Sequence, residues 1–161
     1  MTFKTLVAAA ALVVWAASPA LSQTAPPPYG PPITLEAAKR AMAAAEDHAE
    51  RNKHDVAITI IDSGGNMVMM HKADNTQLAS IPTSEGKALT ALSFKRSSKA
   101  LEDAVAAGGA GLRFLTMKNV TPIEGGLLIF QDGKITGAIG VSGALGTHNA
   151  AVAQAGVDAV K

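Results

Sequence analysis

Two pairs of β-rich segments, each pair separated by a turn sequence, constrain the fold of this chain more than any other feature. Strands joined by a tight turn pair in the antiparallel direction, and Asp132-Gly133 is the strongest short hairpin signal in the chain. The sequence therefore predicts two antiparallel hairpins. Their strands are DVAITIID (55–62) with MVMMHKAD (67–74) across SGGN, and GGLLIF (125–130) with KITGAIGV (134–141) across QDGK.

Helical segments surround and separate the two hairpins. Residues 33–53 begin with Thr34 as N-cap and continue in strong helix formers with an apolar arc. Residues 80–109 are typical of two shorter helices, and residues 149–161 of a small-residue helix. Residues 112–124 read as a less regular connector. This order predicts an α+β domain with helices packed on an antiparallel sheet.

The glycine-rich run at 124–144 is not a phosphate loop. A dinucleotide fingerprint needs its glycines where a strand gives way to a helix, but Gly137 and Gly140 lie inside the predicted strand. The GxSxG nucleophile pattern also fails, because the glycine at 143 directly follows Ser142. Glycine inside a strand indicates a bulge, or the close approach of another backbone or a flat ligand.

The N-terminus differs in composition from the rest. Residues 1–22 combine Lys4, an apolar run and a small-x-small cleavage pattern, which predicts a signal peptide and a periplasmic or secreted protein. An uncleaved membrane anchor is the alternative; after cleavage we expect no stable membrane insertion. Residues 23–32 hold five prolines and predict an extended linker that joins no ladder or helix, so that residues 33–161 form the domain.

Charge and cysteine content exclude several classes. Without residues 1–22 the chain has 13 basic side chains, the 14 of the whole minus Lys4, and 13 acidic ones. A net charge near zero argues against nucleic acid as the main partner. The absence of cysteine excludes disulfides, a thiolate metal site, a cysteine nucleophile and the thioether attachment of a c-type haem.

An ordered set of motifs between about Thr34 and Val160 resembles the GlcG/HbpS family of small haem-binding, so-called haem-degrading, proteins. The resemblance implies a profilin-like αβ sandwich, non-covalent binding of haem b and a homo-oligomer. Leu128 departs from the proline that many members have, and Pro82-Thr83 puts an acidic metal site near Glu85 in doubt. The motifs are VAITIIDSGGNMV (56–68), EGKALTAL (85–92), SKALEDAV (98–105), VTPIEGG (120–126) and DGKITGAIGVSGA (132–144).

Haem needs an apolar slot, an axial donor to iron and cations for its propionates. His48 is the first candidate for the donor, because it lies on the apolar arc of the first helix and some family members use a histidine near that helix's end. His71 is the second candidate. Lys87 and Arg96, with Lys95, could meet propionates, although an exposed helix face is the ordinary place for such charges. We expect His54 in a turn and His148 in a polar loop.

Two alternatives stay open beside a haem-binding module. Period-2 alternation puts Met67, Met69 and His71 on one strand face, and soft thioethers with imidazole suit a periplasmic copper-binding module; the competing interpretation is a half-buried strand with methionine as filler. The second alternative is a haem-degrading enzyme that opens the macrocycle oxidatively. No catalytic base and nucleophile can be identified, and binding is favoured over catalysis. Structural roles are expected for the acids Asp62, Glu85, Glu102 and Glu124.

Overall fold

A computed structural model describes residues 25–161. The predicted signal peptide, residues 1–22, lies outside the described residues. Within residues 25–161 no helix is long and apolar enough to cross a membrane. The elements are α1 (Leu35–Arg51), β1 (Ala57–Asp62), β2 (Met67–Lys72), α2 (Ser80–Phe94), α3 (Ser98–Ala106), the 3₁₀ helix η1 (Gly109–Leu115), β3 (Gly126–Gln131), β4 (Lys134–Ser142) and α4 (Gly146–Asp158).

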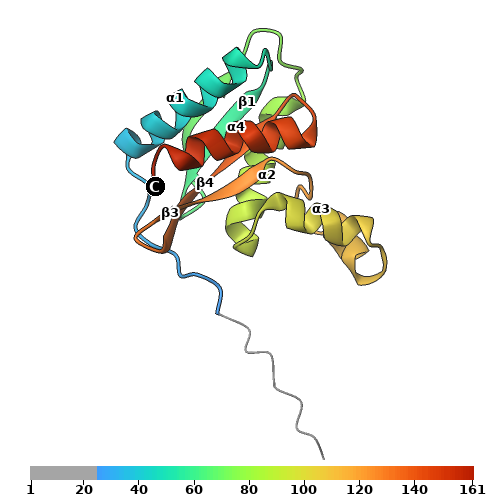
Figure 1. The fold of residues 1–161 in the computed structure, drawn as a ribbon. Coiled ribbons are helices and arrows are strands. Elements are labelled where there is room, and N and C mark those ends of the chain that lie inside the picture. The colour runs from blue at the N-terminus through green and yellow to red at the C-terminus, as the bar shows by residue number, and fades with distance from the viewer. Residues whose placement is uncertain (1–24) are drawn as a thin grey trace, which may run out of the picture.

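The four strands form one antiparallel sheet in the order β2-β1-β4-β3. Helices α1 and α4 lie on one face and α2 on the other, while α3 and η1 extend beyond the end of the sheet (Figure 1). The predicted α+β fold with helices flanking an antiparallel sheet is therefore confirmed. Both predicted hairpins form, and they are joined at the centre of the sheet through β1 and β4.

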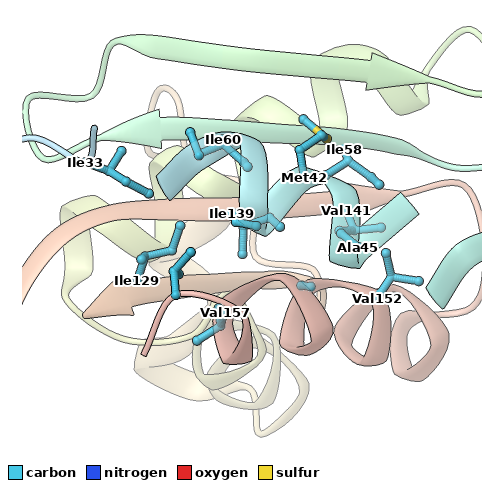
Figure 2. Close-up of a cluster of buried hydrophobic side chains, with 14 of the residues drawn as sticks. Ile33, Met42, Ala45, Ile58, Ile60, Ile129, Ile139, Val141, Val152 and Val157 are labelled. Atoms are coloured by element: carbon cyan, nitrogen blue, oxygen red, sulfur yellow. The ribbon is translucent and has the colours of Figure 1, made fainter. Parts of the chain in front are cut away.

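The larger core lies between α1, α4 and the sheet (Figure 2). Ile58 and Ile60 of β1 lie beside Ile139 and Val141 of β4, and all four side chains are fully buried. The helices meet them with small residues. Alanines on the buried face of α1 let the helix lie close to the sheet, where burial of the isoleucines supplies the hydrophobic stabilisation.

Gly140 of β4 lets α2 lie close to the other face of the sheet. A Cβ on Gly140 would lie 1.9 Å from the carbonyl oxygen of Ser84 and 2.7 Å from the amide nitrogen of Ala88. Beside it, the hydroxyls of Thr59 and Ser84 form a buried hydrogen bond of 2.8 Å. Gly140 thus marks the close approach of another backbone, one of the interpretations that the sequence left open.

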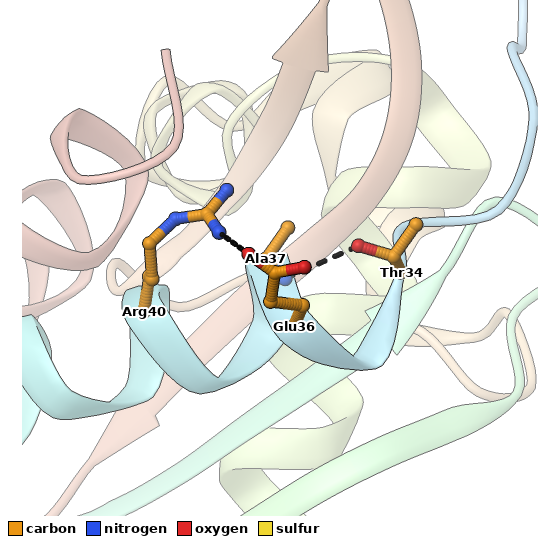
Figure 3. Close-up of polar contacts among 4 residues, drawn as sticks. All are labelled: Thr34, Glu36, Ala37 and Arg40. Carbon is orange, nitrogen blue, oxygen red and sulfur yellow. Dashed lines mark hydrogen bonds and ion pairs between the residues drawn. The ribbon is translucent and has the colours of Figure 1, made fainter.

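Local side-chain interactions, between residues three or four positions apart, stabilise the start of α1 (Figure 3). The Thr34 hydroxyl accepts a hydrogen bond from the amide of Ala37 at 3.2 Å, as an N-cap does. Glu36 and Arg40 form an exposed i,i+4 ion pair at 2.9 Å.

Part of the proline-rich segment joins the fold, which corrects the prediction that residues 23–32 join no ladder. Tyr29 forms a parallel bridge with Ile135. The amide of Gly30 donates to the Ile135 carbonyl at 2.7 Å, and the Ile135 amide donates to the Pro28 carbonyl at 3.0 Å. The Tyr29 hydroxyl donates to the carbonyl of Leu92 at 2.8 Å. Prolines flank the bridge without preventing it, because the amide that it uses belongs to Gly30.

Two element boundaries also differ from the sequence prediction. Helix α4 begins at Gly146 rather than at 149, and η1 occupies the start of the predicted irregular connector. Gly108 and Gly109 have positive φ angles of 73° and 55°, which end the preceding helix and let the chain turn into η1.

Candidate functional site

A cavity of about 370 Å³ opens between the C-terminal end of α1, the start of β1 and the end of β2. This is the corner of the sheet where β2 is an edge strand and where α1 ends at Arg51, before β1 begins at Ala57. Its apolar wall includes Ala49, Val56 and Ile58, and His54 and His71 are among its polar lining residues.

His71 is held in the cavity wall by a carboxylate. Its Nδ1 lies 3.0 Å from Oε1 of Glu46, a residue of α1 that also lines the cavity. His71 pairs with Ile58 of β1, so both side chains lie on the sheet face that α1 covers. Since Nδ1 is taken by Glu46, Nε2 is the ring nitrogen left to bind a ligand.

A pair of stacked histidines lies at the same corner. The rings of His54 and His148 stack, with centroids 4.5 Å apart and planes inclined by 14°. His54 precedes β1 as expected, but His148 lies in the first turn of α4 and not in the predicted loop. The fold thus brings three of the four histidines to one corner, although residues 54, 71 and 148 are distant in sequence.

His48 is not part of this cavity. It is half-buried on α1, and each residue of a helix turns the chain by about 100°. His48 therefore projects about 200° around the axis from Glu46, whose side chain meets His71. Of the two histidines predicted as ligands, the structure places only His71 in the cavity.

The Met67, Met69 and His71 face is broken by an irregularity in β2, which corrects the simple alternation expected from the sequence. Met69 pairs with Ile60, but the register shifts and Met67 pairs with Ile61. Ile60 and Ile61 face opposite sides of the sheet, so Met67 and Met69 do as well. Met69 packs against the core under α1, whereas Met67 is 46% exposed on the other side. No three His, Asp or Glu side chains of residues 25–161 are grouped to hold a metal ion.

Lys87 is buried in the protein interior, not on an exposed helix face. Its side chain is 1% exposed, and its Nζ donates to the Val141 carbonyl at 2.9 Å. Burial lowers the pKa of Lys87 to about 8 from an ordinary 10.5, while the charges of Glu102 and Glu124 act in the opposite direction. Lys87 is therefore enclosed and does not line the His71 cavity.

Arg96 lines a different cavity. It is exposed, and with Lys95 it borders a groove of about 390 Å³ along β3, on the other edge of the sheet. The four predicted binding residues His48, His71, Lys87 and Arg96 thus occupy separate places, and only His71 has the surroundings of a metal ligand.

Sequence reasoning missed Glu46, which belongs to the charged arc of α1. Glu46 is one of many acids on a helix face, and only the pairing of β2 with β1 beneath α1 brings it to His71. The one available signal was that Glu46 borders the apolar arc of its helix.

The chain belongs to the HbpS-like family, whose model, described as "Haem degrading protein HbpS-like", matches residues 33–158. An uncharacterised 15.0 kDa protein of Citrobacter freundii is 32% identical over 128 residues, covering 78% of this chain and 90% of its own. Escherichia coli GlcG is 33% identical over 110 residues, which cover 68% of this chain and 81% of GlcG.

Solved structures agree with this assignment. HbpS is similar with a TM-score of 0.74 and 27% identity, covering 92% of this chain and 99% of its own. A structure described as a PduOC:heme complex has a TM-score of 0.74 and 25% identity, and the match covers 81% of this chain and 96% of that one. The recognised family and the α+β fold therefore rest on sequence and structure together.

Proposed function

We propose that this protein binds haem non-covalently in the cavity at the end of α1, with Nε2 of His71 as the axial ligand to iron. The observation that carries the proposal is the contact between Nδ1 of His71 and Glu46. Histidines that ligate metals in proteins almost always donate their other ring N–H to a carboxylate, a carbonyl or water. A structure of a related protein described as a complex with heme supports the choice of ligand.

The donor set fits haem iron. A single neutral imidazole is the axial ligand of many b-type haem proteins, and absence of cysteine is no obstacle to non-covalent binding. Ala49, Val56 and Ile58 offer an apolar wall to the macrocycle. Lys53 offers a cation to a carboxylate, whereas the Lys72 ammonium donates to the carbonyls of Ala73 and Asp74, and the lining also contains Glu46, Glu50, Asp55 and Asp74. Bound haem would supply the redox chemistry of iron, while this chain binds and orients it.

Each residue of the site has a separate role. Glu46 would accept a hydrogen bond from Nδ1–H of His71, which would fix the ring orientation and direct Nε2 to the metal. His54 lines the same cavity and is held by stacking on His148. A histidine in that position can donate a hydrogen bond to a group bound beside it.

Titration of the chain from residue 23 onward with hemin tests the axial ligand. We expect a saturable Soret shift in the wild type, which His71→Ala weakens by at least about tenfold. Glu46→Gln is expected to keep binding but to weaken it and shift the reduction potential, because the amide is a poorer acceptor for Nδ1–H.

His48→Ala is the matched control, because it removes an imidazole from the same helix without touching the cavity. Unaltered binding in His71→Ala, or a loss confined to His48→Ala, would sink the assignment. Loss of the Soret band with a biliverdin-like product, on addition of reductant and oxygen, would extend the function from binding to degradation.

We further propose that the protein is exported and self-associates. The predicted signal peptide at residues 1–22 supports export. Apolar side chains exposed on and beyond η1 support self-association, since exposed apolar surface favours contact with another protein surface. Leu112, Leu115 and Ile123 are 49%, 61% and 47% exposed.

A further inference from the structure

We propose that the groove along the free edge of β3 is a second binding site, which takes a small amphipathic carboxylate. The groove has a volume of about 390 Å³ and lies between α4 and the junction of α2 with α3. It is at the opposite edge of the sheet from the His71 cavity, so this inference does not depend on the haem proposal.

The floor of the groove is apolar. Leu127 and Leu128 border the groove from opposite faces of β3, and Phe130 of the same strand is 37% exposed. Val157 borders the groove from α4. A pocket of this size with an apolar floor and a few polar groups at one end is the usual form of a small-molecule site.

The rim is cationic without being neutralised. Lys95 and Arg96 border the groove, and no acidic side chain of the described part of the chain lines it. Among residues 25–161, neither side chain lies within 4.0 Å of a carboxylate, although several other cations of the chain do. Two adjacent cations that form no ion pair within residues 25–161, beside an apolar floor, favour a ligand with a hydrocarbon body and one anionic head.

The side chain of Lys95 is held in place by the proline-rich segment. Its Nζ donates to the Pro27 carbonyl at 3.0 Å and lies 4.2 Å from the centre of the Tyr29 ring. Its backbone has a left-handed φ of 51°, a conformation that usually belongs to glycine at a helix end. The proline-rich segment thus holds the side chain of Lys95, a residue that borders the groove, while the second cation, Arg96, donates through Nε to the Phe94 carbonyl at 3.2 Å.

Other occupants fit less well. The lining holds no histidine, methionine or tyrosine, so it offers haem iron no side-chain donor of the usual kinds. An added β-strand is disfavoured because the register of β3 shifts between Ile129 and Phe130, and bulges in an edge strand hinder pairing.

Calorimetry with octanoate and 1-octanol on the chain from residue 23 onward tests the proposal. We expect saturable octanoate binding that Arg96→Gln weakens about tenfold, as loss of a charge-assisted hydrogen bond does, with octanol binding unchanged. Leu127→Ser should weaken both probes. Arg113→Gln, which removes an exposed arginine on η1, is the matched control and should change neither.

The competing outcomes separate the two sites. His71→Ala is expected to leave octanoate binding at its wild-type value, whatever it does to haem. Absence of saturable octanoate binding, equal affinity for octanol, an equal effect of Arg113→Gln or binding only of extended peptides would each overturn the carboxylate site.

Discussion

Gly140→Ala is expected to abolish the folded state or to reduce the free energy of unfolding by more than about 4 kcal/mol. The new methyl group would lie 1.9 Å from the Ser84 carbonyl oxygen and 2.7 Å from the Ala88 amide, and both are backbone atoms of α2. No rotamer change relieves such a contact, so α2 must move away from β4. That movement would also break the buried Thr59–Ser84 hydrogen bond.

Urea denaturation followed by circular dichroism measures this effect. Gly133→Asn is the control: Gly133 has a φ of 72° with no atom within 4 Å of an added Cβ, and asparagine tolerates that conformation. We expect the control to cost about 1 kcal/mol or less. If Gly140→Ala lowers the free energy of unfolding by no more than the control does, the close approach of α2 is not what requires glycine here.

The hairpins could be predicted because their signals are local. Asp132-Gly133 sets a turn between two segments of strand composition. In the same local way, Thr34 caps the start of α1. Antiparallel pairing then follows from the short connections. The bulge in β2 could not be predicted, because a one-residue register shift depends on how Met67 and Met69 pack on opposite faces of the sheet.

The candidate site depends on tertiary packing in the same way. The place of His71 in a strand makes it a candidate from sequence alone, but its proposed role as a ligand depends on Glu46, which only tertiary packing brings to it. Lys87 illustrates the reverse. Its helix is flanked by β4 on one side and by the turn into β3 on the other, so a residue read as solvated is enclosed.

Raising the pH from 7 to 10 is expected to increase the contribution of Lys87 to the free energy of unfolding by about 2–3 kcal/mol. The folded-state pKa is about 8 and the ordinary value is 10.5. Between these values the unfolded chain binds more protons at this position than the folded chain, so stability rises with pH. The cost of the buried charge is fully present below pH 8 and is lost as the pH approaches 10.5.

Lys87→Met should remove this rise, because methionine keeps much of the side chain's bulk and does not titrate. At neutral pH the variant gains by eliminating a buried charge and loses the hydrogen bond to the Val141 carbonyl, two effects that oppose each other. The decisive quantity is therefore the difference between wild type and variant in their pH dependence, measured by urea denaturation at pH 7 and pH 10.

Lys39→Met supplies the control, since Lys39 is exposed on α1 and should keep the wild-type dependence on pH. Because all other titratable groups are shared, their contributions cancel in the comparison. A Lys87→Met protein whose stability follows the same pH curve as the wild type would mean that the buried amine keeps its ordinary pKa. In that case Glu102 and Glu124 would fully offset its loss of hydration, and the interior around Gly125 would be more polar than its packing indicates.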